Sequence, residues 1–115
     1  MKSEQAQASH AETLAPVFAA LGQPARLQVV RLLLAAFPKG VPAGDIQEEL
    51  GIPASTLSHH LHRLREVGLV EAVRESQWIR YAVRADTLQG VLDFLYSECC
   101  SRNAVVSPDL AGRCC

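Results

Sequence analysis

The spacing of hydrophobic residues changes twice along this 115-residue chain, and these changes restrict the fold more than any other feature. From about His10 to Val67, apolar residues recur at the i, i+3, i+4, i+7 spacing of amphipathic helices. Residues 69–74 and 78–83 are instead rich in β-branched and aromatic side chains, which is typical of a β-hairpin. Helical spacing then returns at residues 88–99. The chain is therefore expected to be mainly α-helical with one β-hairpin, an α+β arrangement.

Glycine and proline residues mark the predicted ends of the helices. Gly22 and Pro24 separate a first helix, which starts at about His10, from a second helix that ends before Pro38. The apolar stripe of the first helix is predicted to consist of Leu14, Val17, Phe18 and Leu21. The buried face of the second is predicted to consist of Leu27, Val29, Val30, Leu33, Leu34 and Phe37. The stripe of the last helix is predicted to consist of Leu88, Val91, Leu92, Leu95 and Cys99.

Two short helices joined by a glycine-containing turn are predicted, one at residues 43–50 and one from Ala54 or Ser55 to about Val67. This spacing is the pattern of a helix-turn-helix, and the following hairpin makes it a winged helix-turn-helix. We expect one domain over residues 10–100, a disordered N-terminal segment over residues 1–9 and a flexible, cysteine-containing tail over residues 101–115.

The second of these two helices carries a polar and cationic outer face that suits contacts with DNA. The chain has 11 Lys and Arg against 12 Asp and Glu, which excludes a protein that coats nucleic acid through bulk positive charge. Between residues 55 and 84, however, five arginines oppose three glutamates. The candidate DNA-binding residues are Ser55, Thr56, Ser58, His59, His62, Arg63, Arg74 and Arg80.

The same residues allow other interpretations. The helical spacing by itself is equally consistent with a polar face that only contacts solvent and with a face that binds DNA. The hairpin that follows the helix favours DNA binding. A metal site at His59 and His62 is less favoured than a DNA contact. His60 is expected to be partly packed. Trp78 is expected to pack in the core or on the hairpin rather than to stack on bases.

Neither a secretion signal nor a membrane span is indicated. The N-terminus has no apolar segment of the signal-peptide type, and the longest apolar run, residues 32–37, is far shorter than the roughly 20 residues that cross a bilayer. A cytoplasmic protein without membrane contact is expected. Its four cysteines all lie in the last 17 residues. In a reducing compartment, clustered cysteines favour metal binding or redox sensing over structural disulfides.

Four runs of residues resemble the ArsR/SmtB family of metal-responsive repressors. They are LGQPARL at residues 21–27, STLSHHL at 55–61, LREVGLV at 64–70 and WIRY at 78–81. The resemblance covers about residues 10–100 and implies a transcriptional repressor, not an enzyme. It also implies a homodimer, with the first and last helices at the interface, that binds a palindromic operator in double-stranded DNA.

The cysteines resemble the inducer site of one branch of this family. The sequence DIQEE at residues 45–49 lacks the cysteine pair that some members carry there, and no histidine follows His62 to build the zinc or cobalt site of others. The remaining candidate resembles the arsenic-responsive subgroup, whose vicinal cysteine pair and third cysteine bind As(III) or Sb(III). Soft trivalent arsenic prefers three thiolates. The implied ligands are Cys99, Cys100, Cys114 and Cys115.

The chain departs from that subgroup because its third cysteine, Cys114, is distant from the first pair and is followed directly by Cys115. The third thiolate ligand therefore stays open between these two. A thiol redox or persulfide sensor of the same fold is an alternative. A small thiol enzyme or metalloid carrier is less favoured because no base or oxyanion arrangement lies near the cysteines.

Overall fold

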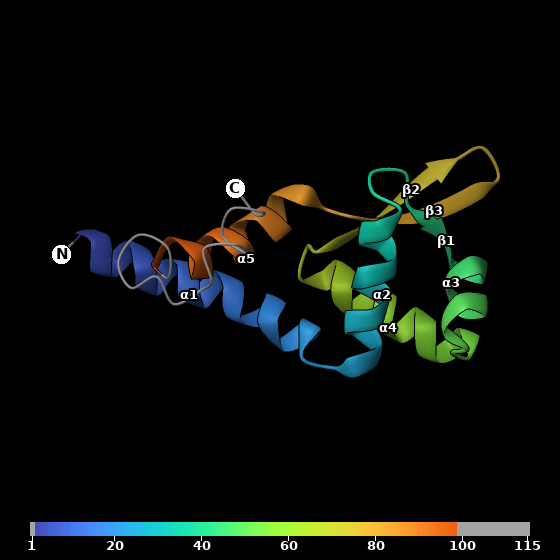
Figure 1. Cartoon of the computed structure of the whole chain (residues 1–115), viewed down its shortest axis with the longest axis horizontal. Coiled ribbons are helices and arrows are strands. Elements are labelled where there is room, and N and C mark those ends of the chain that lie inside the picture. Colours follow the sequence, from blue (N-terminus) through green and yellow to red (C-terminus); the bar gives the residue numbers. More distant parts are fainter. Residues whose placement is uncertain (1, 99–115) are drawn as a thin grey trace, which may run out of the picture.

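The computed structural model describes the backbone of residues 2–98 and the side chains of residues 10–97. The elements follow in the order α1 (Lys2–Leu21), α2 (Pro24–Ala35), β1 (Val41–Pro42), α3 (Ala43–Leu50), α4 (Ala54–Glu66), β2 (Val70–Glu75), β3 (Trp78–Val83) and α5 (Ala85–Glu98). Over this part of the chain, five helices and a small antiparallel sheet form a winged helix-turn-helix (Figure 1). The predicted fold class is confirmed.

The sheet includes a strand, β1, that the sequence did not predict. The strand order is β1-β3-β2, and Val41 and Pro42 of β1 pair with Tyr81 and Arg80 of β3. Proline is tolerated there because β1 is an edge strand, where a missing N–H need not break a ladder. Gly40 precedes it with φ +86, and a Cβ at this position would lie 2.7 Å from the carbonyl oxygen of Tyr81. Only glycine allows the chain to approach β3 so closely.

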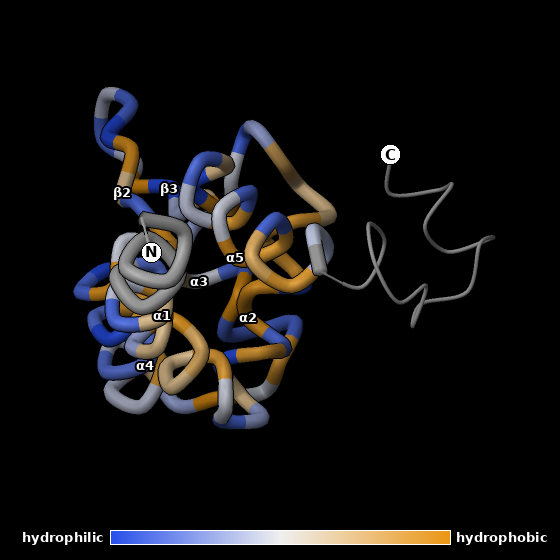
Figure 2. Tube along the Cα trace, turned by 90° about the vertical axis from the view of Figure 1, so that its left-hand side faces the viewer, coloured by the Kyte–Doolittle hydropathy of each residue, from blue (hydrophilic) through white to orange (hydrophobic). Residues whose placement is uncertain are grey.

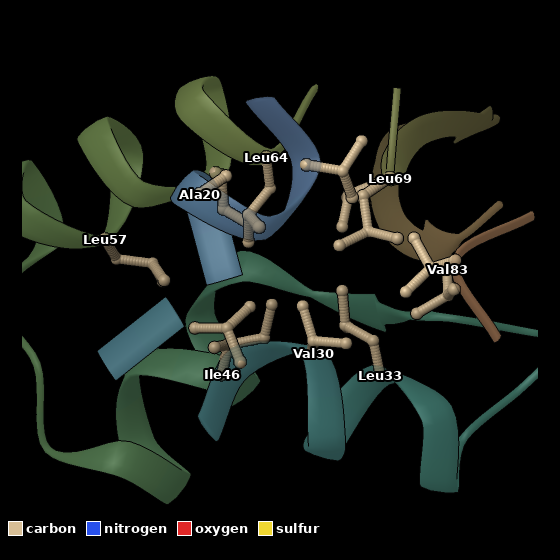
Figure 3. Packing of buried hydrophobic residues seen from close by; sticks show 13 residues of the cluster. Ala20, Val30, Leu33, Ile46, Leu57, Leu64, Leu69 and Val83 are labelled. Atoms are coloured by element: carbon tan, nitrogen blue, oxygen red, sulfur yellow. The ribbon is translucent and has the colours of Figure 1, made fainter. Parts of the chain in front are cut away.

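The core lies where the helices meet the inner side of the sheet (Figure 3). Its largest fully buried side chains are Val29, Leu33, Ile46, Leu57, Leu64 and Leu69. The predicted stripe of α1 is confirmed, since Val17 is buried and Leu14, Phe18 and Leu21 pack partly against the core. Because α4 contributes Leu57, Leu61 and Leu64, the core determines which face of this helix points outward.

The predicted buried face of α2 is only half correct. Val29, Val30 and Leu33 are buried, but Leu27 and Leu34 are exposed. The apolar face of α2 is wider than the surface that the neighbouring elements cover. One part of this face is therefore buried and the other part stays exposed. Phe37, also predicted to be buried, lies beyond the end of α2 at Ala35 and is exposed.

The first and last helices lie side by side and extend away from the body of the molecule (Figure 1). α1 begins at Lys2, earlier than the predicted start at about His10. Residues 2–9 include two Gln and two Ala, which have high helix propensity. In α5, Val91 is buried as predicted, whereas Leu92 and Leu95 are 53% and 55% exposed.

Within residues 2–98, no single helix is long and apolar enough to cross a membrane. Only the helix pair His10–Leu21 and Pro24–Ala35 meets the length and hydropathy criteria together, and it is bent by 99°.

Candidate nucleic-acid interface

The outer face of α4 is polar, cationic and accessible along its whole length. Gly51 ends α3 with a left-handed φ of 65°, and Pro53 precedes α4 in an extended conformation, so the two helices follow each other after a tight turn. The core side of α4 holds the leucines described above. All six candidates that the sequence placed on this helix are exposed: Ser55, Thr56, Ser58, His59, His62 and Arg63.

Glu66 lies at the end of this face and pairs with two of its cationic groups. Its Oε1 atom is 3.4 Å from Arg63 Nη1 and 3.7 Å from His62 Nε2. Exposed ion pairs of this kind contribute little free energy, so an incoming phosphate can displace the carboxylate at small cost. Over the described residues, no group of three or more His, Cys, Asp and Glu side chains could hold a metal ion.

His60 holds α4 in place from behind. It is only 7% exposed, more deeply buried than the partial packing expected of it, and its Nδ1 atom lies 3.4 Å from Nη1 of Arg26 in α2. Arg26 Nε in turn donates a hydrogen bond to the carbonyl oxygen of Ala20 in α1. Burial first, and then the charges of Arg26 and His59, lower the pKa of His60. The neutral ring can accept a hydrogen bond from Arg26, and this chain of contacts joins α1, α2 and α4.

Sequence reasoning missed the role of Arg26. The burial of His60, the partner of Arg26, could have been predicted from the sequence. His60 comes three residues after Leu57 and therefore falls on the buried stripe of α4. A histidine on a buried helix face needs a hydrogen-bonding partner. Which residue supplies the partner depends on how α2 crosses α4.

The two hairpin arginines predicted to contact DNA, Arg74 and Arg80, differ in exposure. Arg74 is exposed. Arg80 is half-buried in the central strand β3, and its Nε atom lies 3.6 Å from Glu75 Oε2. Of the two positions expected for Trp78, the core is excluded because this side chain is 64% exposed, and the residue lies on the hairpin at the start of β3.

The α4 helix and the tip of the hairpin lie on the same side of the molecule. Figure 2 shows both at the left, with α2 and α5 on the right. Arg65, which sequence reasoning did not select, lines an open groove between α4 and β2 together with Arg84, Glu66 and Glu71. The fold therefore combines a helix and a projecting hairpin into one face that could contact DNA.

Hydrogen bonds tie the beginning of α5 to the turn after α4. The hydroxyl of Thr87 donates a hydrogen bond to the carbonyl oxygen of Gly68 at 2.6 Å. The backbone N–H of Arg84 donates to the carbonyl oxygen of Leu69 at 2.8 Å. Asp86 accepts from the Thr87 N–H, and this bond, ahead of the nearby Arg84, lowers the pKa of Asp86. The four predicted thiol ligands, Cys99, Cys100, Cys114 and Cys115, lie outside the described residues.

Comparison with known proteins places this geometry among transcriptional regulators. Residues 21–73 match the model of a helix-turn-helix domain. The chain is 32% identical to the HTH-type transcriptional regulator YgaV of Escherichia coli over 84% of this chain and 94% of that protein. It is also 32% identical to the transcriptional repressor SdpR of Bacillus subtilis, over 69% of this chain and 84% of that protein.

Solved structures show the same architecture. An ArsR-like transcriptional regulator from Rhodococcus sp. RHA1 superposes with a TM-score of 0.69 and 27% identity, over 78% of this chain and 80% of that one. The homodimeric winged helix-turn-helix DNA-binding domain of Mb0332 from Mycobacterium bovis, a possible ArsR-family regulator, superposes with a TM-score of 0.63. Its identity is also 27%, over 81% of this chain and 85% of that one.

Proposed function

This chain belongs to the ArsR family of winged helix-turn-helix transcriptional regulators, and we propose that it is a repressor that binds operator DNA as a homodimer. The observation that carries the proposal is the exposed polar face of α4 next to the projecting hairpin. Hydroxyl, imidazole and guanidinium groups on a helix suit base edges and phosphates in the major groove. SdpR, one of the relatives, is itself a repressor.

A dimer is supported by the exposed apolar residues of α5. Leu92 and Leu95 lie on the helix that packs beside α1, away from α4. A second copy would cover them, as in the homodimeric Mb0332 domain. Two-fold symmetry would then place two α4 helices on half-sites about one DNA turn, roughly 34 Å, apart, which requires a palindromic operator.

The direct test is a gel-shift titration of the full-length chain with a duplex selected from a random library. We expect one dimer per palindromic site and about tenfold weaker binding for His59→Ala. Because Gln28 is an exposed polar residue of α2, Gln28→Ala is the control and should bind as tightly as the unmodified chain. A chain that binds no duplex, or binds equally well after His59→Ala and other changes of the α4 face, would contradict the proposal.

We propose further that the inducer is As(III) or Sb(III), held by Cys99, Cys100 and one thiolate from Cys114 or Cys115. These residues include every cysteine of the chain, and the first pair directly follows Glu98, the last residue of α5. Soft trivalent metalloids prefer thiolate ligands. The bonds of Thr87 and Arg84 connect the other end of α5 to the turn after α4, so a shift of α5 can reach the DNA-binding face.

Arsenite should therefore release the chain from its operator in the gel-shift assay. The Cys99→Ser, Cys100→Ser double variant should stay bound, whereas Cys114→Ser and Cys115→Ser, made separately, identify the third ligand. Release of the double variant by arsenite would contradict the assignment. Release by an oxidant without metalloid, with a Cys–Cys bond detected by mass spectrometry, would instead favour a thiol redox sensor.

A further inference from the structure

Arg26 occupies a position in α2 where its charge is locally unfavourable. It is the third residue of this helix, which begins at Pro24, and the first turn holds no acidic residue. The free N–H groups of a helix N-terminus carry a partial positive charge, so a cation beside them is destabilising. The backbone N–H of Arg26 donates to the side chain of Gln23, and this cap does not involve the guanidinium. The local structure of α2 therefore gives no reason for an arginine here.

The guanidinium instead closes the C-terminal end of α1. Its Nε atom donates a hydrogen bond of 2.5 Å to the carbonyl oxygen of Ala20, next to Leu21 at the end of the helix. The last carbonyl groups of a helix have no partner within it, and their partial negative charge favours a cation. α1 has no basic residue in its own last turn. Because Ala20 is fully buried, solvent does not compete for this bond.

The same guanidinium reaches α4 through His60. Its Nη1 atom lies 3.4 Å from Nδ1 of this ring, which is only 7% exposed. The preceding side chain, His59, is exposed on the face proposed to contact DNA, and the centroids of the two rings are 6.1 Å apart. A guanidinium is rigid and planar, so its contacts at two edges hold both partners in a fixed relation. Arg26 thus ties the end of α1 to the middle of α4.

We propose that Arg26 is a positioning residue that fixes α4 relative to α1 and thereby sets the half-site spacing that a dimer can bind. This inference rests on the proposed function, in which the dimer forms on the α1 and α5 side and α4 contacts DNA. Two-fold symmetry repeats any shift of α4 in the second protomer. Each base pair between two half-sites moves them apart by about 3.4 Å, so one spacing suits one arrangement of the two α4 helices.

The link between α1 and α4 requires a neutral His60. An arginine only donates hydrogen bonds, so Nδ1 must accept, whereas a protonated ring has no acceptor and repels the guanidinium. Over residues 10–97, the charged or titratable groups that act on this ring are Arg26 of α2 and His59 of α4 itself. Acid should therefore loosen α4 and make the dimer less selective for one spacing.

Gel-shift titrations of the full-length chain test this with three duplexes that share the same half-sites. One has the spacing selected from the random library, and the others are longer or shorter by one base pair. Arg26→Gln should bind the selected spacing about tenfold more weakly and the other two almost as well as the unmodified chain does. Arg26→Lys keeps the charge without the planar fork and should behave in the same way. Val29→Ala, a buried change in the same helix, is the control for lost stability and should keep the spacing preference.

A pH series on the unmodified chain tests the link without changing Arg26. The ratio of affinities for the selected and the longer spacing cancels the general gain in DNA binding when the exposed His59 and His62 become protonated. Because burial lowers the pKa of His60 from 6.5, this ratio should be constant above pH 6.5 and fall once the pH drops below the lowered pKa. In His60→Gln, whose amide oxygen accepts from Arg26 at any pH, the ratio should stay constant.

Equal losses on all three duplexes for Arg26→Gln, matching those of Val29→Ala, would make Arg26 a purely stabilising residue and overturn the proposal. A ratio that does not change in acid would overturn it as well. Dissociation of Arg26→Gln into monomers, measured by sedimentation, would assign the guanidinium to dimer formation instead. Equal binding of all three spacings by the unmodified chain would overturn the positioning role and leave the proposed repressor intact, whereas a chain that binds no duplex contradicts the proposed function itself.

Discussion

The α4 and α5 helices each bury one face and expose the other, but their exposed faces have opposite chemistry. α4 buries leucines and presents serine, histidine and arginine side chains outward. α5 buries Val91 and presents Leu92 and Leu95 outward. Each helix thus leaves one face exposed in the single chain, and the two faces differ in what they can bind.

This difference separates a lasting contact from a reversible one. Covering a fully exposed leucine side chain stabilises an assembly by about 1.5–3 kcal/mol. Leu92 and Leu95 are about half exposed and would each contribute part of this, so the α5 face favours a lasting partner. Polar groups on α4 are well solvated, and they exchange water and counterions for DNA with a smaller net gain. A repressor requires this combination, because the dimer must persist while the DNA contact is made and released.

The largest expected effect comes from making the α5 face polar. The Leu92→Glu, Leu95→Glu variant should be monomeric because it places four carboxylates at a two-fold interface. Operator affinity should fall at least about 100-fold, since the second half-site no longer adds avidity. Sedimentation and gel shift together measure both quantities. A monomer that still binds a full palindrome tightly would break the proposed division of roles between α4 and α5.

A smaller effect is expected from the α4 face. Arg63→Ala should weaken operator binding about tenfold and lower the salt slope by about one, without changing sedimentation. Arg31→Ala is the matched control because Arg31 is an exposed arginine of α2. Equal losses for the two variants would mean that net charge, rather than the α4 face, determines binding.

The link between the two helices is tested at Thr87. Thr87→Val keeps the shape but removes the donor to Gly68, so the free energy of unfolding should fall by about 1 kcal/mol. Thr87→Ser retains a hydroxyl and should recover most of that loss. Arsenite should also release the Val variant from DNA less completely. Full release by arsenite would show that this bond is not needed for coupling.

The smallest effect is expected from the histidine behind α4. Because the folded pKa of His60 is lowered from 6.5, the unfolded chain binds the proton more readily. Stability should be fully present above about pH 6.5, fall as the pH decreases below it, and level off once the folded ring is protonated. Denaturant titrations of the unmodified chain and of His60→Gln should differ in this window, with the Gln variant less pH-dependent. Identical pH profiles would contradict the assignment.

Much of the fold could be predicted because its signals are local. The turn at residues 51–53 determines where α3 ends and where α4 begins. The hairpin follows from two runs of β-forming residues on either side of a polar turn. The outward face of α4 was predictable for the same reason: three leucines at helical spacing define its opposite side. The strand β1 could not be predicted, because two residues are too few to show an alternating pattern. They form a strand only by pairing with β3.

Apolar spacing by itself determined that α1, α2, α4 and α5 are amphipathic helices, because a helix repeats its side chains every 3.6 residues wherever it packs. It did not determine which apolar residues are covered. Leu34 and Leu92 satisfy the same rule as Leu33 and Val91, yet only the latter two are buried.

Tertiary structure decided this because burial depends on which neighbours reach a side chain, and these neighbours come from distant parts of the sequence. The same reason placed Arg26 behind His60 and left Trp78 exposed at the hairpin tip.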